Sequence, residues 1–202
     1  MIYVIGASGF AREAADVVMA LGDSPVFVIA PGEVIKGPVY AGCESIHEDQ
    51  VKTSTPYVLG MGNPVIRRKV AEKMTEKGLK PTTLVHPTAV IGKENEIGEG
   101  TIVTAGVVIT NRCNIGAHCI LNLNTTIGHD CTIGNYAEFS PGCSINGFTF
   151  VGEGVNCGSG TVTIPEAKIG EWSVIGAGAV VKGEIPPRSL AVGVPAKVIK
   201  TL

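Results

Sequence analysis

Aliphatic residues recur at every sixth position between residues 85 and 181, in one unbroken phase. Fourteen of these seventeen positions hold Val, Ile or Leu, nine are followed by Gly, and fourteen are preceded two residues earlier by Ala, Ser, Thr or Cys. Because a period of six matches neither a helix nor an open strand, we predict a parallel β-helix of three-sided coils. The aliphatic side chains point inward, and Gly accommodates the turns without a Cβ penalty. The short strands of a sandwich or barrel would not keep one phase for so long.

Strands and helices alternate in the first eighty residues, which predicts a small parallel sheet with Rossmann-like order. We place the boundary between this α/β domain (1–80) and the β-helix domain (81–202) at Lys80-Pro81. A structured tail follows the last regular repeat. The expected elements are strands at 2–5, 26–29 and 57–59, a Gly-rich turn at 6–9, a helix at 10–21, and a helix that begins at Pro64 after the N-cap Asn63 and is closed by Gly78.

Composition narrows the classes of partner. The chain has 202 residues, 45% of them hydrophobic and 17% charged, and its net charge is −2. Without an excess of Lys or Arg, we expect neither nucleic acid nor an anionic membrane as a partner, and small molecules are the expected ligands. The apolar start, Met1 to Ile5, lacks a basic segment and runs into a Gly-rich turn, so we expect a cytoplasmic protein without a signal peptide.

Six cysteines could form disulfides or hold a metal. Five of them fall on inward positions of the repeat, however, which favours reduced, buried side chains that fill small spaces. Four occupy the small inward position and one the aliphatic position; in chain order they are Cys113, Cys119, Cys131, Cys143 and Cys157.

A candidate anion site lies where the first predicted helix begins. Backbone N–H groups there would face a phosphate, and Gly6 and Gly9 would let it approach, with Ser8 and Phe10 beside it. Asn63, before the second predicted helix, is a further candidate for substrate binding. The glycines could equally do no more than close the turn. A G-x-G-x-x-G fingerprint is absent, and Ala30-Pro31-Gly32 stands where an acidic residue would end the second strand, so dinucleotide redox chemistry is disfavoured.

A second candidate site follows from the coil length. With eighteen residues per coil, Gly147 lies one coil above His129, about 4.8 Å away along the stack. A histidine next to a backbone N–H could combine a general base with a donor to an oxyanion. A lone histidine on a repeat surface can equally be only solvated.

The unbroken hexads, followed by Pro186-Pro187-Arg188-Ser189 and by Gly193 to Lys197, resemble the left-handed β-helix, hexapeptide-repeat acyltransferases. More narrowly, Gly6 to Glu13, Asn122 ahead of His129-Asp130-Cys131, and the Pro-Ala-Lys tail resemble the bacterial subgroup that acetylates nucleotide-linked amino sugars or sialic acids. The resemblance implies a nucleotide-sugar-binding N-terminal domain, acetyl-CoA as co-substrate without a metal, and a homotrimer with active sites between subunits.

The resemblance also implies roles for single residues. His129 would take the proton from the acceptor amine, Asp130 would orient His129, and the Gly147 amide would bind the thioester oxygen. Adjacent residues of a strand point apart, so His129 and Asp130 must lie at a corner. Asn122 would line the same site.

The resemblance also implies roles for several further residues, and each of them could instead have only a structural or solvated role. Glu138, half a coil from His129, would assist only across a subunit interface, or it is a solvated carboxylate. Small residues late in the β-helix would line a groove for the pantetheine arm or serve only as turns, and the tail lysine would approach a CoA phosphate or be solvated. These residues are Gly158, Ser159, Gly176, Ala177, Gly178 and Lys197. We expect His118 and His86 to be surface residues.

The sequence therefore predicts an acetyl-CoA-dependent N-acetyltransferase acting on a nucleotide-linked amino-dideoxy sugar of a bacterial surface glycan. The nearest alternative is an O-acetyltransferase of sialic acid or another sugar. A zinc enzyme on the same β-helix would need three converging histidines, and His118 and His129 do not offer a close pair. A non-catalytic assembly protein is the remaining alternative. The nucleotide base stays open, because Ala30 to Glu33 lacks the acidic pair found in relatives that bind uridine nucleotides.

Overall fold

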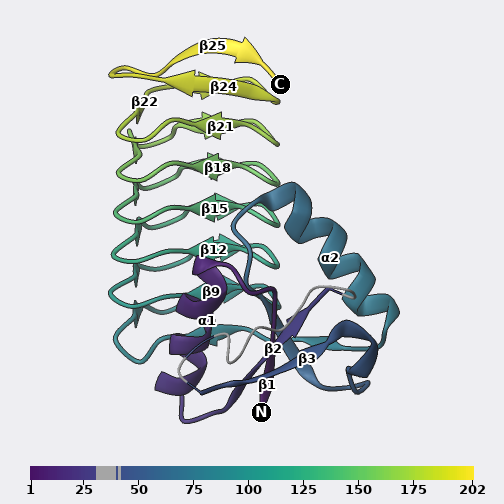
Figure 1. Cartoon of the computed structure of the whole chain (residues 1–202). Coiled ribbons are helices and arrows are strands. Elements are labelled where there is room, and N and C mark those ends of the chain that lie inside the picture. Colours follow the sequence, from purple (N-terminus) through teal and green to yellow (C-terminus); the bar gives the residue numbers. More distant parts are fainter. Residues whose placement is uncertain (31–39, 41) are drawn as a thin grey trace.

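The computed structural model describes residues 1–30, 40 and 42–202, and it contains a small α/β sheet next to a tall stack of coils (Figure 1). In the sheet, five parallel strands of the described chain take the order β3-β2-β1-β4-β5. Their bounds are β1 (Ile2–Ile5), α1 (Gly9–Ala20), β2 (Pro25–Ile29), β3 (Glu44–His47), the 3₁₀ turn η1 (Glu48–Gln50), β4 (Pro56–Leu59), α2 (Pro64–Glu76) and β5 (Lys80–Pro81).

The repeat forms three sheets in the described chain, which we call walls 1, 2 and 3. Wall 1 contains β6 (Leu84–Val85), β9 (Ile102–Val103), β12 (Ile120–Leu121), β15 (Glu138–Phe139), β18 (Asn156–Cys157), β21 (Val174–Ile175), β24 (Ser189–Val192) and β25 (Lys197–Thr201). Wall 2 contains β7 (Val90–Ile91), β10 (Val108–Ile109), β13 (Thr126–Ile127), β16 (Ser144–Ile145), β19 (Val162–Thr163) and β22 (Val180–Val181). Wall 3 contains β8 (Glu96–Ile97), β11 (Asn114–Ile115), β14 (Thr132–Ile133), β17 (Phe150–Val151), β20 (Lys168–Ile169) and β23 (Glu184–Ile185).

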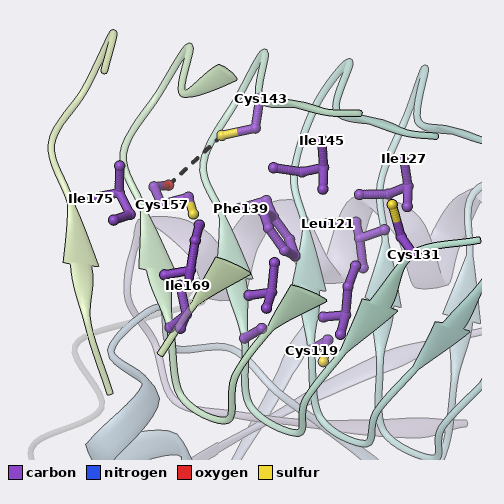
Figure 2. Packing of buried hydrophobic residues seen from close by; sticks show 14 of the residues in the cluster. Cys119, Leu121, Ile127, Cys131, Phe139, Cys143, Ile145, Cys157, Ile169 and Ile175 are labelled. Atoms are coloured by element: carbon purple, nitrogen blue, oxygen red, sulfur yellow. Dashed lines mark hydrogen bonds between the residues drawn. The ribbon is translucent and has the colours of Figure 1, made fainter. Parts of the chain in front are cut away.

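The predicted fold is confirmed. Strands eighteen residues apart pair in parallel, as Ile109 with Ile127 and Ile127 with Ile145. The inward side chains form one continuous core, in which Phe139 packs among aliphatic and cysteine side chains (Figure 2). The five repeat cysteines are buried as expected, and the Cys143 thiol donates to the carbonyl of Cys157 at 3.8 Å.

One expectation about the corners needs correction. The left-handed conformation falls two residues after the Gly that follows each aliphatic, often on a residue with a side chain, as at Asp130 (φ 58°) and Tyr136 (φ 58°). The Gly that follows the aliphatic residue is required instead because the backbone of the next coil lies very close to it. A Cβ on Gly128 would lie 2.6 Å from the Gly147 nitrogen of the next coil, so no larger residue fits there.

The bounds of the predicted helices and strands agree closely with the structure, although the structure also contains strands that were not predicted. Both helices and the first three predicted strands are present within one or two residues of their expected ends, and Asn63 caps α2 by accepting from Val65 at 3.0 Å and Ile66 at 3.1 Å. The sequence did not indicate β3, β5 or the antiparallel pair β24 and β25 that ends wall 1.

The α/β sheet packs on wall 1 through α1. Leu84 and Ile102 of that wall share a buried cluster with Ala11 and Val18 of α1 and with Val4 of β1. Strand β5, where we placed the domain boundary, pairs with β4 of the α/β sheet. The division at residues 80 and 81 stays a prediction. In the described ranges, neither helix is long and apolar enough to cross a membrane.

Candidate active site

The corner between walls 2 and 3 carries His129 and Asp130, just after β13. Asp130 adopts a left-handed φ of 58°, which turns its carboxylate toward its neighbour, and Oδ2 lies 2.7 Å from His129 Nδ1. This is the corner geometry that the pairing of adjacent residues required. A proton on Nδ1 that is donated to Asp130 leaves Nε2 with its lone pair, so in neutral imidazole Nε2 is the basic atom.

Arg112 holds Asp130 from the coil below. Its Nε donates to Oδ1 at 2.9 Å and its Nη2 donates to Oδ2 at 3.1 Å, a two-pronged contact between residues eighteen apart. Hydrogen bonds from Arg112 and then His129 lower the pKa of Asp130 below its ordinary value. Asp130 is therefore a carboxylate at neutral pH and accepts the Nδ1 proton. Arg112 was not predicted as a site residue, although its spacing of one coil from Asp130 was a usable signal.

Gly147 lies against the other side of the imidazole. A Cβ at this position would lie 2.8 Å from His129 Cε1 and 2.9 Å from Nε2, so the ring occupies the space that any side chain here would need. Within the described residues, the Gly147 N–H has no acceptor. The basic nitrogen and an unused backbone donor thus lie on adjacent coils of one corner. The stacking expected from the eighteen-residue coil is present.

Two neighbouring features fix this corner. The Phe148 ring meets His129 edge-on, with ring centroids 5.1 Å apart, and both side chains are about half exposed. Behind Gly147, Thr163 takes an aliphatic position of the repeat, and its hydroxyl accepts from the Asn146 N–H at 2.9 Å and meets the Thr149 hydroxyl at 2.9 Å. This buried polar network holds the backbone next to Gly147 in place.

The small residues predicted to line the pantetheine groove lie on a different corner, between walls 1 and 2, and Asn122, predicted to bind the substrate, lies with them. Asn122, Gly158 and Gly176 form one column there, with Ser159, Ala177 and Gly178 beside them. Asn122 is buried and its side chain accepts from the Leu123 N–H at 2.7 Å. Strand β13 separates it from His129, so a single chain does not bring the two together. Lys197 is exposed at the start of β25.

The predicted nucleotide site lies where the strand order reverses, between β1 and β4. The loops after these strands touch, because the Ser8 hydroxyl donates to the Gly60 carbonyl at 2.9 Å and Gly60 N–H donates to the Ile5 carbonyl at 2.9 Å. Ligands of open α/β sheets bind at such a point. A Cβ on Gly60 would lie 2.6 Å from the Ala11 Cβ, so glycine is required for the close approach of α1.

The two helices differ at their N-termini in a way that favours an anion at α1. Asn63 occupies the first donors of α2, whereas the side chain of Ser8, engaged with Gly60, does not cap α1. The first-turn N–H groups of α1 therefore remain available beside Gly6 and Gly9. Phe10 packs partly into the α1 cluster rather than standing free. Pro31, Gly32 and Glu33, on which the nucleotide-base argument rested, lie outside the described residues.

Asn63 and Glu138 lie apart from His129. Asn63 borders a hollow of ≈ 260 Å³ that α2 forms with upper coils of the β-helix, near Asn156, Trp172 and Arg188. Glu138 is on wall 1, where its carboxylate lies 3.5 Å from Arg67 Nη1 and faces Gly62. In the described chain, no group of three His, Cys, Asp or Glu side chains is placed to hold a metal ion.

His118 corrects an expectation. It is 8% exposed rather than on the surface, and its ring stacks on Tyr136 with centroids 5.4 Å apart and lies 6.3 Å from the Tyr57 ring. Burial, and to a lesser degree the nearby Arg67 charge, lower its pKa to about 4. The sequence could not show this, because Tyr57 comes from β4 of the α/β sheet.

These features define a hexapeptide-repeat β-helix of the acetyltransferase type, joined to a small α/β unit with a parallel sheet. Residues 1–74 match the family described as the PglD N-terminal domain. The chain is 29% identical over 135 residues to GDP-perosamine N-acetyltransferase of Escherichia coli O157:H7, a match that covers 67% of this chain and 53% of that protein. It thus spans about half the length of that curated relative.

Solved structures match over almost the whole chain. The acetyltransferase domain of PglB from Neisseria gonorrhoeae FA1090, in complex with acetyl coenzyme A, has a TM-score of 0.91 and 28% identity and covers 98% of each chain. PerB from Caulobacter crescentus, in complex with CoA and GDP-perosamine, has a TM-score of 0.88 and 29% identity and covers 98% of this chain and 97% of that one. The expected resemblance to sugar acetyltransferases is confirmed.

Proposed function

We propose that this chain is an acetyl-CoA-dependent N-acetyltransferase that acts on a nucleotide-linked amino-dideoxy sugar in the synthesis of a bacterial surface glycan. The observation that carries the proposal is the stack of Asp130, His129 and Gly147 on one corner, with Nε2 directed at the backbone of the next coil. The likeness to PerB, solved with CoA and GDP-perosamine, and to GDP-perosamine N-acetyltransferase supports the substrate class.

In this proposal the chemistry is an acyl transfer. The sugar amine attacks the thioester carbonyl, a C–N bond forms, and Nε2 of His129 takes the proton that the nitrogen loses. The Gly147 N–H donates to the oxygen as its charge develops. When the C–S bond breaks, the imidazolium returns its proton to the departing thiolate, which leaves as CoA thiol. Asp130 stabilises the imidazolium while it exists.

We further propose a homotrimer in which the active site lies between subunits. Within one chain, wall 2 separates the His129 corner from the corner that carries Asn122, Gly158 and Gly176, so a site built from both corners needs a neighbouring copy. The outward side chains of wall 2 are uncharged, which suits a buried contact. They are Val90, Val108, Thr126, Ser144, Val162 and Val180, whereas wall 3 presents Glu96, Lys168 and Glu184.

The test is the release of CoA thiol from acetyl-CoA with a panel of acceptors. The panel holds GDP-, UDP- and dTDP-linked 4-amino-4,6-dideoxy sugars, their hydroxyl counterparts, and sialic acids. We expect turnover on at least one amino sugar and none on its hydroxyl counterpart. Turnover restricted to hydroxyl acceptors would instead establish an O-acetyltransferase.

A further inference from the structure

Arg67, in the first turn of α2, is a buried cation that joins two parts of the chain. It is 1% exposed, and its guanidinium donates to backbone carbonyls of both the loop after β4 and the corner between walls 3 and 1. The acceptors are Met61 (3.1 Å) and Gly62 in the loop, and His118 (2.9 Å), Tyr136 (2.6 Å) and Ala137 (3.3 Å) at the corner. A planar group with five donors suits such a set, and a lysine could not replace it.

The charge of Arg67 has one carboxylate beside it in the described chain. Glu138 Oε2 lies 3.5 Å from Nη1, and its side chain is 14% exposed. Burial raises the pKa of Glu138, while Arg67 counteracts that shift. Breaking a buried pair of this kind leaves one charge uncompensated, which is costly. Glu138 therefore acts as the counter-charge of Arg67 within the same chain.

The loop that Arg67 holds is the one that meets the predicted nucleotide crevice. Its carbonyls at Gly60, Met61 and Gly62 accept from Ser8 or Arg67. The N–H groups of Met61, Gly62 and Asn63 have no acceptor within the described residues. Gly62 also lies close to the β-helix, since a Cβ there would be 2.9 Å from Glu138 Oε1.

We propose that Arg67, with Glu138 as its counter-charge, is a positioning residue for acceptor binding. It ties the loop of residues 60–63 to the β-helix and directs the free loop N–H groups toward the nucleotide-linked acceptor. This inference rests on the proposed function, because the acceptor is the nucleotide sugar of that reaction. Arg67 is not a catalytic residue. Its guanidinium contacts only the loop, the corner of the β-helix and Glu138, so its effect on the acceptor would be exerted through the loop.

The test compares Arg67→Lys, Glu138→Gln and Gly62→Ala with the matched control Arg68→Lys, which changes the exposed neighbour on the same helix. Steady-state kinetics with each substrate varied in turn give separate KM values. We expect the first three variants to raise KM for the acceptor about tenfold or more, and KM for acetyl-CoA less than about twofold. Arg68→Lys should leave both KM values unchanged. A purely structural role would instead reduce the active fraction and leave both KM values as they were.

Hydrogen exchange of the unliganded protein provides a readout without turnover. Amides of residues 60–63 should exchange faster in Arg67→Lys and Glu138→Gln, while those of the β13 and β16 coils should not change. If Arg67→Lys does not fold, Glu138→Gln and Gly62→Ala carry the test. Unchanged acceptor KM and unchanged loop exchange in these variants would overturn the inference. Absence of wild-type turnover on every amino sugar, with faster loop exchange in the variants, would refute the proposed function and leave the loop contact standing.

Discussion

The orientation of His129 depends on side chains from two coils. Asp130 fixes the Nδ1 side of the ring, and Arg112, one coil below, fixes Asp130 through two hydrogen bonds. Each partner is reachable only because Asp130 occupies a left-handed corner position. An orientation set by hydrogen bonds in this way preserves the Nδ1–H tautomer, which leaves Nε2 free as a base.

Asp130→Asn tests this arrangement. An amide keeps the size of the carboxylate but cannot stabilise the imidazolium, so kcat should fall about tenfold to a hundredfold with little change in thermal stability. Arg112→Met, which leaves the carboxylate in place, should reduce kcat less. Equal kcat values for wild type and Asp130→Asn in steady-state assays would remove Asp130 from the mechanism.

Gly147→Ala tests the contact between adjacent coils. The added Cβ would lie 2.8 Å from His129 Cε1, so the ring must move and Nε2 shifts away from the proposed thioester position. We expect kcat to fall about tenfold or more, since small displacements of reacting groups are costly. The control is Gly183→Ala, with φ +79° and open space around it, which should lose stability but keep its kcat. Full activity of Gly147→Ala would contradict the close contact between the His129 ring and Gly147 in the active enzyme.

At the scale of elements, the α/β sheet and the β-helix meet around buried polar side chains. His118 packs between Tyr57 and Tyr136, and its Nδ1 is buried without a partner in the described residues. The pKa of His118 is lowered from 6.5 to about 4, because a charged imidazole cannot be solvated there and Arg67 is near. Burial of a neutral histidine makes the stability of this contact depend on pH.

The expected direction follows from the lowered pKa. Between pH 4 and 6.5 the unfolded chain binds a proton at His118 and the folded chain does not. The free energy of unfolding is therefore highest above pH 6.5 with respect to this group, and it falls as the pH decreases. The total loss by pH 4 is on the order of 3 kcal/mol. Chemical denaturation at pH 5 and pH 7.5 gives the free energy of unfolding at each pH. The difference between the two values should be smaller for His118→Phe than for the wild type, whereas His86→Gln should show the wild-type difference. An equal pH dependence for His118→Phe would show that His118 does not titrate as expected.

At the scale of the whole molecule, the corner carrying His129 and the corner carrying Gly158 and Gly176 flank wall 2. Val162→Glu places a charge on that wall and should give a monomer without measurable turnover. Thr132→Glu, exposed on wall 3, should keep the oligomeric state of the wild type, a trimer in this proposal, with normal turnover. Light scattering measures the oligomeric state of each variant, and CoA-release assays on the same samples measure its turnover. A wild-type protein that is active as a monomer would exclude the proposed subunit interface.

The sequence predicted what local repetition determines. The sixfold phase of residues such as Ile127 and Ile145 gave the coils, and the coil length placed His129 beneath Gly147. It did not predict contacts between distant segments. Arg67 and His118 are 51 positions apart, and no periodicity links them. Strand β3 was also missed, because its pattern of partly exposed residues gave no clear alternation.

The most direct test of the account is the kcat of His129→Asn with acetyl-CoA and the amino sugar that the wild type accepts. Asparagine cannot take the amine proton, so we predict a fall of about a hundredfold or more, with unchanged circular dichroism and melting temperature. Wild-type kcat in a folded His129→Asn protein would contradict the assignment of His129 as the base.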